Sequence, residues 1–492
     1  MTAMPEPLGA PELIDLDPDD LAGFYQQASR VSGRDRSLSM EALHLGPDVL
    51  LDLPEIAGLR GRPTAVAMVV DDQPMWRAGA DLKSLVVDLL TGAGLQVRTI
   101  VLSDPHDLHT TTEHVEELRA QLQPTDTVVS VGSGTITDLA KHAVFGIEQQ
   151  QPGLRMFHVA VATANSVGAY TSQLAVVTTN GVKRTVPSRL PDRLVLDTRT
   201  LADTPADYAL GGIGDAAVGC CSLADYRLAN WCGMGDWEPL SRAVFLPGLT
   251  GFLDREPSFT AGGTATAGAM ATNLAAAGFA MSFAGESAPA SGLEHVTSHM
   301  LDMAADHNGR PIGNHGEQCG LATALVLLAY RYLLAEFDPR PFLDGLPAVD
   351  EEQAREQVER VFNELDPSGA MASECWADYA AKCRSWTEHG AEVLALLRDW
   401  ERRKPELAEL AADPERYLRA LAATGHPLDF ADVPPGLGPD EVRWAFAHAR
   451  LMRRRLSVAD FLGFLGLWTD ELVDRLFAEF NQLREPSHRS RR

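Results

Sequence analysis

The sequence predicts two structural parts, an α/β unit built on a parallel sheet and a longer all-helical unit that follows it. The first observation is that short apolar runs rich in β-branched residues alternate with helix-like stretches between residues 61 and 200. The second is a change near residue 201 to long segments rich in alanine and leucine. Strands that alternate with helices at this spacing form parallel sheets covered by helices.

The individual elements follow from local pattern. The turn signal Gly61-Arg62-Pro63 precedes the first β-rich run. The expected α/β elements are strands at 64–70, 97–102, 127–131, 157–162 and 173–178, with helices at 78–90 and 111–122. The expected later helices include 271–281, 320–334 and 392–400. The resulting division is a helical N-terminal extension at 1–60, an α/β domain at 61–200, a helical domain at 201–484 and a flexible basic tail at 485–492.

The composition argues against several classes of function. With 42 basic and 68 acidic side chains among 492 residues, the chain carries a formal charge of −26 that repels polyanions, so we expect no nucleic-acid partner. The longest strongly apolar run, 321–330, is shorter than the roughly 20 residues of a membrane span. The N-terminus does not resemble a secretion signal, and the six cysteines include no CxxC pair. We therefore expect a cytoplasmic protein with reduced thiols and no membrane partner.

A glycine-rich loop follows the strand at 127–131. It reads Gly132-Ser133-Gly134-Thr135, with Asp138 in the helix-like stretch that comes next. Glycines allow close approach of a phosphate, and the free N–H groups at a helix start carry partial positive charge. The loop therefore predicts a pyrophosphate site, although the same pattern also makes ordinary tight turns.

Three stretches of the helical half carry metal-ligating residue types. They read GGIGD at 211–215, SGLEHVTSH at 291–299 and NHGEQ at 314–318. His295 and His299 are four residues apart, which places both imidazoles on one helix face. An Asp and two or three His from separate helices form the usual shell of a divalent transition metal. Any one of these histidines alone would be read as a capping or core residue.

The order of these stretches resembles a known family. The runs VGSGTITDLAK, TANSVGAYTS, GVKRTVPSRLPDRLVLD, GGIGD, SGLEHVTSHMLDM and NHGEQCG are similar to sn-glycerol-1-phosphate dehydrogenases. These belong to a superfamily that includes iron-containing alcohol dehydrogenases, glycerol dehydrogenases and dehydroquinate synthases. The resemblance covers about 64–330 and implies a Rossmann-like NAD(P)-binding domain followed by a helical metal-binding domain.

The resemblance also implies site residues and a reaction. Asp215, His295 and His315 would hold one nickel, zinc or iron(II) ion that polarises the substrate oxygen during hydride transfer. Asp215 is thereby part of the catalytic set, and His299 is our candidate for substrate contact and proton relay. Glu317 is expected to orient a metal ligand. The residues implied to contact NAD or NADP are Gly132, Ser133, Gly134, Thr135, Asp138, Thr163, Ser166, Ser172 and Lys183.

The chain departs from the family pattern near the implied substrate. Gly168 stands where relatives carry an aspartate that reaches substrate hydroxyls. Glu286 and Ala288 replace a serine and an arginine. If the arginine position holds phosphate, its loss removes a charge-assisted contact. Arg453-Arg454-Arg455 is interpreted as a solvated helix end that needs no ligand.

Three functions remain open from the sequence. The first is a metal-dependent, NAD(P)-linked dehydrogenase or reductase of a small polyol, ketone or aldehyde, with altered substrate contacts. The second is a lyase or cyclase that uses the same site with only transient oxidation, as dehydroquinate synthase does. The third is a non-catalytic binding protein on the same scaffold. The family tends to form homodimers or larger assemblies, so we also expect a homo-oligomer.

Overall fold

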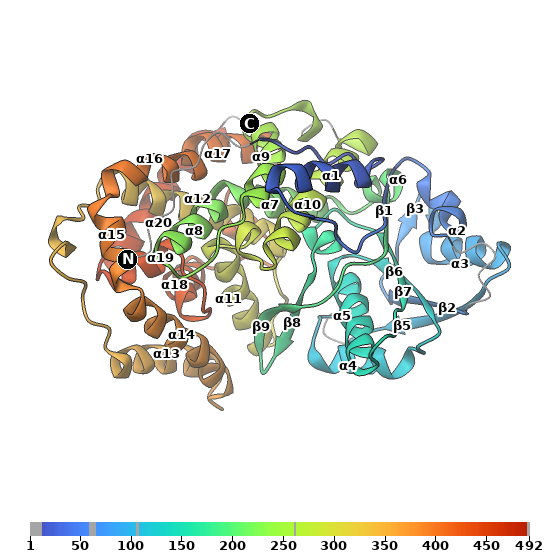
Figure 1. Ribbon diagram of the computed structural model, residues 1–492, viewed down its shortest axis with the longest axis horizontal. Helices are drawn as coiled ribbons and strands as arrows, with labels where there is room; N and C mark the ends of the chain where they lie inside the picture. Colours follow the sequence, from blue (N-terminus) through green and yellow to red (C-terminus); the bar gives the residue numbers. More distant parts are fainter. Residues whose placement is uncertain (1–11, 59–64, 105–107, 260–261, 490–492) are drawn as a thin grey trace.

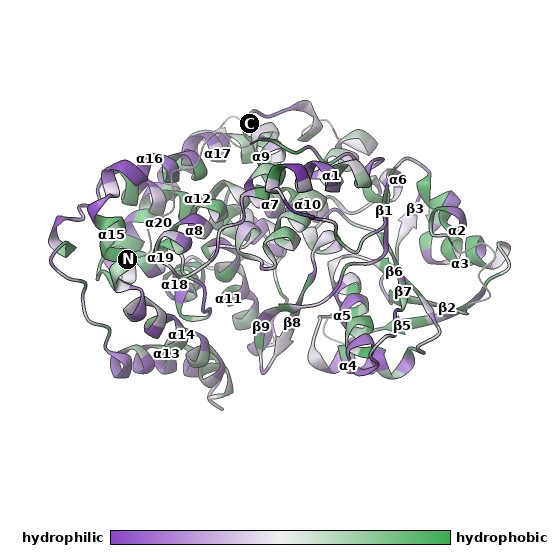
Figure 2. Ribbon diagram, viewed as in Figure 1, coloured by the Kyte–Doolittle hydropathy of each residue, from purple (hydrophilic) through white to green (hydrophobic). Residues whose placement is uncertain are grey.

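The protein is described here by a computed structural model that covers residues 12–58, 65–104, 108–259 and 262–489 (Figure 1). A sheet with its covering helices forms one end of the molecule, and a larger group of helices forms the other. The predicted order of an α/β part followed by a helical part is confirmed. The strands of the sheet and the central helices are coloured mostly hydrophobic, whereas several peripheral helices are mostly hydrophilic (Figure 2).

A six-stranded sheet carries the α/β part. Its strand order is β1-β10-β7-β6-β2-β5, and every neighbouring pair is parallel. The strands are β1 (Ala42–Gly46), β2 (Ala65–Asp71), β5 (Gln96–Leu102), β6 (Thr127–Gly132), β7 (Phe157–Ala162) and β10 (Arg193–Asp197). Two antiparallel hairpins lie outside it, β3 (Trp76–Arg77) with β4 (Ala80–Asp81), and β8 (Leu174–Thr179) with β9 (Val182–Pro187).

Helices cover both faces of the sheet. On one face, α2 (Leu53–Ile56) and α3 (Leu82–Gly92) bury a row of valines. On the other, α4 (Thr112–Gln121) and α5 (Gly134–Gln150) pack on Ala67, Val69 and Val128. The same face continues under α1 (Leu21–Ser32), whose Phe24 lies against the Phe279 ring at 5.2 Å between centroids. Both faces of the sheet are therefore buried from solvent, which is typical of parallel sheets.

The helical part begins after α6 (Thr198–Ala202) and surrounds one extended apolar core. Its first helices, which carry the predicted metal ligands, are α7 (Ala206–Ala217), α8 (Gly219–Trp231), α9 (Pro239–Leu253), α10 (Gly263–Ala284), α11 (Leu293–His307) and α12 (His315–Ala335). The later helices are α13 (Glu351–Leu365), α14 (Ala370–Glu388), α15 (Gly390–Arg398), α16 (Trp400–Leu410), α17 (Pro414–Ala423), α18 (Pro439–His448), α19 (Val458–Phe464) and α20 (Asp470–Arg489).

Some boundary predictions were wrong. Residues 1–60 are not purely a helical extension, because β1 within them forms an edge of the main sheet beside β10. In contrast, the strand expected at 173–178 is present as β8, and it pairs with β9 outside the main sheet. The tail expected from residue 485 is still helical to Arg489. The Gly61-Arg62-Pro63 turn lies outside the described residues.

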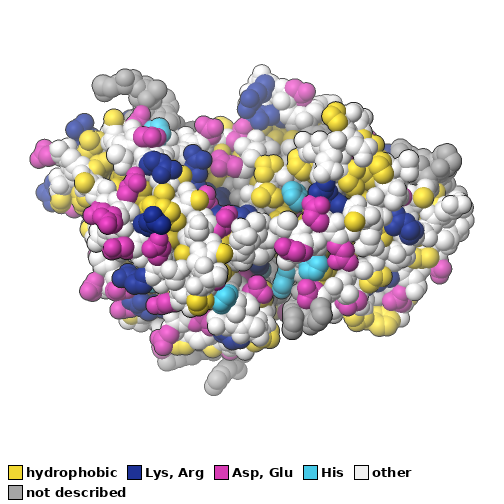
Figure 3. Space-filling model, turned by 90° about the horizontal axis from the view of Figure 1, so that it is seen from below, with side chains coloured by type: hydrophobic (Ala, Val, Ile, Leu, Met, Phe, Trp, Pro, Cys, Tyr) yellow, Lys and Arg dark blue, Asp and Glu magenta, His cyan; other side chains and the backbone are white. Residues whose placement is uncertain are grey.

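Two apolar helices are longer than the apolar run at 321–330 that the sequence shows. By length and composition, α10 and α12 could each cross a membrane. However, 67% and 78% of their apolar windows are buried inside the molecule. Helices that are apolar on all sides either lie in the core of a large protein or cross a membrane, and the burial of these two is that of core helices. On the face shown in Figure 3, basic side chains are scattered among acidic ones and form no continuous basic patch.

Candidate active site

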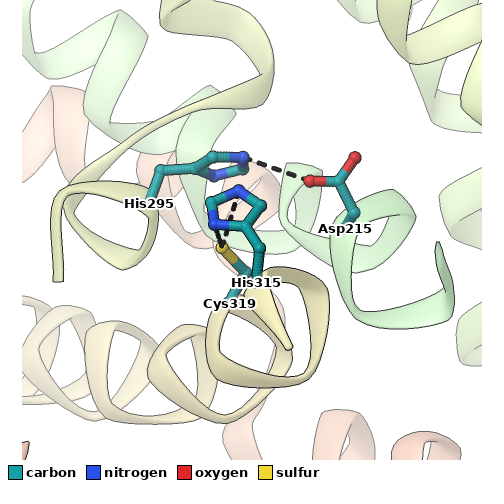
Figure 4. Close-up of side chains that lie close together, drawn as sticks. All are labelled: Asp215, His295, His315 and Cys319. Atoms are coloured by element: carbon teal, nitrogen blue, oxygen red, sulfur yellow. Dashed lines mark hydrogen bonds and ion pairs between the residues drawn. The ribbon is translucent and has the colours of Figure 1, made fainter. Parts of the chain in front are cut away.

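Three helices bring the predicted metal ligands together. Asp215 comes from the end of α7, His295 from the first turn of α11 and His315 from the start of α12 (Figure 4). The Nε2 atom of His295 lies 3.2 Å from Oδ1 of Asp215. The ligand atoms of these residues and of Cys319 all lie within 4.8 Å of one another. The cluster therefore offers one carboxylate, two imidazoles and a thiol to a common point.

Close backbone packing between α7 and α12 positions two of these ligands. A Cβ atom added at Gly214 would lie 1.9 Å from the carbonyl oxygen of Gly316, and one added at Gly316 would lie 1.9 Å from that of Gly211. Only glycine permits such an approach. The glycines that flank Asp215 and His315 in the sequence thus let the two helices bring these side chains into one cluster.

Both candidate ligand histidines are held through the ring nitrogen that faces away from the cluster. Nδ1 of His295 lies 3.0 Å from Oε1 of Glu294, and Nδ1 of His315 lies 2.8 Å from Oγ of Ser298. These contacts leave the Nε2 atoms facing the cluster, as metal-binding histidines require. Glu317, which the sequence singled out for this role, does not fill it. Its Oε2 atom is buried without a hydrogen-bond partner among the described residues, and burial, with a contribution from Asp207, raises its pKa to about 7.

Cys319 was missed by the sequence interpretation, which treated every cysteine as a core thiol. It is fully buried, and its Sγ atom lies 3.6 Å from Nε2 of His315. The two side chains are four residues apart on α12, so they share one helix face. That spacing was the available signal. Although burial acts in the opposite direction, the neighbouring His295 and His315 lower the pKa of Cys319.

His299 stands beside this cluster and contacts an unexpected cation. Its ring stacks on that of His315 with 5.3 Å between centroids. Its Nδ1 atom accepts a hydrogen bond of 2.7 Å from the Arg453 guanidinium. Burial, then the charges of Arg453 and His315, hold the pKa of His299 well below its usual value. The interpretation of Arg453 as part of a solvated helix end was therefore wrong: of the three consecutive arginines, only Arg454 is exposed.

The predicted glycine loop forms the junction of β6 and α5. Gly132 ends the strand, while Ser133, Gly134 and Thr135 are partly exposed at the carboxyl end of the sheet. Ser133 is the N-cap of α5, but its side chain makes no capping hydrogen bond. The N–H groups of the first turn of this 17-residue helix are thus free to receive an anion. This geometry fits the expected pyrophosphate.

The other predicted cofactor residues lie on segments close to that loop. Thr163 follows β7 and donates its N–H to the carbonyl of Gly132. A Cβ atom added at Gly134 would lie 2.5 Å from Val167, which comes directly after Ser166. The loop after β6 and the loop after β7 therefore lie against each other.

Three of the predicted cofactor residues make internal contacts instead. Asp138 is buried, 2.9 Å from the Lys141 ammonium, and accepts a hydrogen bond from the backbone of Val176. Ser172 is also buried, and its hydroxyl accepts from the backbone of Leu174. Lys183 pairs with buried Asp302 at 2.6 Å. In this structure each of them supports a segment of the site.

Lys141 is a further residue that the sequence interpretation passed over. Its buried ammonium donates to the carbonyls of Ala169, Ser172 and Leu174 at 2.7, 3.1 and 2.8 Å. It therefore fastens the segment 169–174 to α5, the helix that follows the glycine loop. A lysine in an apolar helix was the signal, because buried lysines occur almost only with partners.

Gly168 explains one departure from the family pattern. Its N–H donates a hydrogen bond of 3.1 Å to Oδ2 of Asp215. A Cβ atom added there would lie 2.9 Å from the carbonyl oxygen of Leu274 in α10. The side chain of an aspartate at this position would collide with the α10 backbone. Glycine at residue 168 therefore allows α10 to pack close to this segment.

The other two departures lie on the short turn between α10 and α11. Ala288 is buried, whereas Glu286 is half-buried. Burial raises the pKa of Glu286, and the nearby charge of Arg455 acts against that rise. Residue 288 therefore lacks the arginine of the family pattern, but Arg455 brings a guanidinium charge close to the same turn.

Comparison with known proteins identifies the family. A model described as iron-containing alcohol dehydrogenase matches residues 44–205. Glycerol-1-phosphate dehydrogenase (NAD(P)+) of Halalkalibacterium halodurans is 30% identical over 302 residues, which cover 60% of this chain and 71% of that protein. The chain belongs to the iron-containing alcohol dehydrogenase family.

Further comparisons extend the similarity over most of the chain. Glycerol-1-phosphate dehydrogenase (NAD(P)+) of Bacillus subtilis is 26% identical over 444 residues, covering 89% of this chain and 95% of that protein. The glycerol dehydrogenase structure from Schizosaccharomyces pombe has a TM-score of 0.54 at 15% identity and covers 90% of this chain and 91% of its own. An alcohol dehydrogenase from Oenococcus oeni gives 0.52 at 15% identity, with coverages of 86% and 97%. These structures share the fold, and the resemblance inferred from the sequence is confirmed.

Proposed function

We propose that this member of the family is a metal-dependent, NAD(P)-linked dehydrogenase or reductase of a small polyol, ketone or aldehyde. Relatives named glycerol-1-phosphate dehydrogenase (NAD(P)+) support the reaction class. The observation that carries the proposal is the convergence of Asp215, His295 and His315. This cluster is joined through the Gly168 N–H to the loop after β7, which lies against the glycine loop.

The described residues fit a divalent metal ion. Asp215, His295 and His315 would hold it through one carboxylate oxygen and two Nε2 atoms, with Cys319 as a fourth donor within reach. Donors of mixed N, O and S type suit zinc, nickel or iron(II). When bound, the ion would supply Lewis-acid polarisation of the substrate oxygen, and the nicotinamide would exchange hydride with the substrate carbon.

The remaining chemistry is assigned to the side chains around this cluster. Glu294 and Ser298 fix the orientation of the two ligand imidazoles. His299 accepts the Arg453 N–H at Nδ1, so its neutral ring carries the proton at Nε2. From there it donates a hydrogen bond to the substrate oxygen and positions it. This role replaces the proton relay expected from the sequence, because a protonated ring would face the guanidinium.

The first turn of α5 binds the cofactor pyrophosphate in this proposal. Ser133, Gly134 and Thr135 are the residues in contact, because they are partly exposed and flank the free N–H groups. Thr163 and Ser166 complete the contact surface from the neighbouring loop. Asp138, Ser172 and Lys183 stay as supporting residues whose own contacts hold that surface in place.

The test is turnover by the purified full-length protein. It would be loaded in turn with nickel, zinc and iron(II), and absorbance at the nicotinamide band would be followed with dihydroxyacetone phosphate and with unphosphorylated ketones and aldehydes. Metal-dependent NAD(P)H oxidation that is lost in Asp215→Asn supports the proposal. Tight cofactor binding without net turnover would instead favour the lyase or cyclase reaction, and the absence of both metal and cofactor binding would favour a binding protein.

We also propose that the enzyme acts in the cytoplasm as a homo-oligomer, without a nucleic-acid or membrane partner. The acidic net charge of −26 argues against a nucleic-acid partner, and the burial of α10 and α12 argues against a membrane partner. The homo-oligomer rests on what the family resemblance implies. Light scattering of the purified protein would give the subunit number, and a monomer would contradict the proposed assembly.

A further inference from the structure

A buried carboxylate on α8 stands behind the candidate metal ligands. The Asp225 side chain belongs to a residue that is only 1% exposed. Its Oδ2 atom accepts the N–H of Leu293 at 3.0 Å, and its Oδ1 atom accepts the Tyr330 hydroxyl at 2.6 Å and the N–H of Val458 at 2.8 Å. One side chain thus joins the starts of α11 and α19 to the side of α12.

The first turn of α11 depends on this carboxylate. Gly292 is the N-cap of the helix and offers no side chain to the free N–H groups of that turn. Asp225 accepts one of them, from Leu293, and its negative charge lies at the positive end of the helix dipole. The metal-ligand candidate His295 is in the same turn. A shift of the helix start would therefore move the His295 ring.

Glu294 connects this turn to the His295 ring. Its Oε1 atom accepts the N–H of Gly292 at 2.6 Å and lies 3.0 Å from Nδ1 of His295, while the Cys221 thiol lies 3.2 Å from Oε2. A Cβ atom added at Gly292 would lie 2.7 Å from Oδ2 of Asp225 and 2.7 Å from Oε2 of Glu294. The absence of a side chain at Gly292 therefore lets the two carboxylates approach each other.

Two carboxylates buried at close range are costly for the folded state. Burial, and then the charge of Glu294, raises the pKa of Asp225 to about 7. Replacement of buried charged groups by well-packed apolar residues is often neutral or stabilising. Stability alone therefore does not explain why Asp225 stands behind a candidate metal ligand.

We propose that Asp225 is a positioning residue of the candidate metal centre, which fixes the first turn of α11 so that the His295 ring meets the ion in one orientation. The inference rests on the proposed function, because it needs a metal ion at the Asp215 cluster. Asp225 acts through the hydrogen bonds of that turn and is not itself a ligand. Since it also accepts the N–H of Val458, the C-terminal part of the chain contributes to the metal site without supplying a ligand.

The chain offers matched variants for a test. Asp225→Asn keeps the size of the side chain, but it removes the charge and turns one acceptor into a donor. Tyr330→Phe leaves the carboxylate in place and removes one of its donors. Asp197→Asn is the control, because Asp197 is another buried carboxylate that accepts two backbone N–H groups, those of Leu50 and Thr200, but it lies in the sheet.

The first measurement is the affinity of the full-length protein for cobalt(II), by competition with a chelator. We expect Asp225→Asn to bind cobalt about 10-fold more weakly than the unaltered protein and to shift the visible d–d bands of the bound ion. Tyr330→Phe should act in the same direction but less, whereas Asp197→Asn should change neither affinity nor bands. Urea unfolding would give the stability of each variant. Unchanged affinity and bands in Asp225→Asn would overturn the proposal, however unstable that variant is.

A double variant distinguishes positioning from general destabilisation. If Asp225 acts through the Glu294 contact with His295, Asp225→Asn added to Glu294→Gln should weaken cobalt binding by less than the product of the two single losses. Losses that multiply would mean that Asp225 acts independently of this contact and would contradict the proposal. Where Asp225→Asn does not fold, Tyr330→Phe replaces it in both measurements.

Turnover separates this inference from the proposed function. If Asp225→Asn lowers cobalt affinity but the metal-loaded, unaltered enzyme oxidises no NAD(P)H, the positioning role stands and the dehydrogenase does not. If the unaltered enzyme turns over and Asp225→Asn keeps its affinity and bands, the dehydrogenase stands and the positioning role does not. An unaltered protein that binds no divalent metal would refute both.

Discussion

Asp215 shows how the site is assembled from single residues. One of its oxygens faces His295, and the other accepts the N–H of Gly168 from the sheet domain. The same carboxylate thus belongs to the candidate metal cluster and to the junction between the two parts of the molecule. Its neighbours Glu294 and Ser298 hold the two imidazoles, so the cluster is oriented before any ion arrives.

Cys319 decides whether a bound metal has three protein ligands or four. We expect cobalt(II) added to the metal-free protein to show an intense sulfur-to-metal charge-transfer band in the near ultraviolet, because the Sγ atom lies with the other donors. Cys319→Ser should lose this band and still bind cobalt through the other donors. The matched control is Cys232→Ser, another buried thiol, which should keep the band. A spectrum unchanged in Cys319→Ser would show that the thiol is only a neighbour.

At the scale of residues, the sequence predicted the side chains that lie within short, recognisable motifs. Asp215, His295 and His315 each stand inside a recognisable run of residues, and the structure brings all three together. Arg453 could not be found in this way, because its contact with His299 joins positions 154 residues apart. Local composition made the three arginines look like a solvated end, and only tertiary packing distinguishes Arg453 from Arg454.

At the scale of elements, the crossing of α7 and α12 controls the geometry of the cluster. We expect Gly214→Ala to destabilise the protein by roughly 3 kcal/mol, because its Cβ would meet the backbone oxygen of Gly316, which has no flexible side chain to yield. Metal content should fall with stability, since Asp215 would move away from His315. Urea unfolding and metal analysis would measure both effects.

Gly92→Ala is the control for this change. A Cβ atom at Gly92, in the last turn of α3, meets nothing within 4 Å, so we expect little change or slight stabilisation. If Gly214→Ala were as stable as Gly92→Ala and kept its metal, close helix contact would not be what positions Asp215.

The sheet contains a buried titratable group, His158 in β7. Its Nε2 atom lies 2.9 Å from the Ser130 hydroxyl, and burial, reinforced by Arg189, holds its pKa well below the ordinary 6.5. The unfolded chain therefore takes up a proton below pH 6.5 that the folded chain refuses, and stability is lost as pH falls. For one such group, the free energy of unfolding falls by at most about 1.4 kcal/mol for each pH unit below 6.5.

We expect His158→Gln to flatten this acid-side loss, since glutamine can still bond Ser130 but does not titrate. Unfolding by urea at several pH values between 5 and 8 would give the slope for each variant. His307→Gln, at an exposed position, should leave the slope unchanged. Parallel slopes for His158→Gln and the unaltered protein would mean that other groups govern the acid limb.

The elements that the sequence missed share a physical reason. β1 is a short strand of mixed polarity, ALHLG, at the edge of the sheet, and it is separated from its partner β10 by most of the α/β domain. No local apolar run marks such a strand. The strands that were predicted correctly, such as β2 and β6, are buried on both faces and therefore read as continuous apolar runs.

At the scale of the whole molecule, metal binding should stabilise the fold. The candidate ligands come from three helices, and an unfolded chain does not bring them together, so an ion binds the native state preferentially. At a free metal concentration 1,000 times the dissociation constant, the expected gain is about 4 kcal/mol. The midpoint of thermal unfolding should rise on metal loading, and Asp215→Asn should abolish most of the rise. An equal rise in that variant would place the ion elsewhere.

The pairing of β1 with β10 has a consequence for how the protein is made. On the ribosome, β1 emerges early but finds its partner strand only after about 150 more residues have been added, which takes roughly 8 to 30 s at ordinary rates of synthesis. During that interval residues 42–46 lack their partner strand, and their backbone groups are hydrogen-bonded to water. We therefore expect the α/β part to reach its native form only after residues 193–197 have been made.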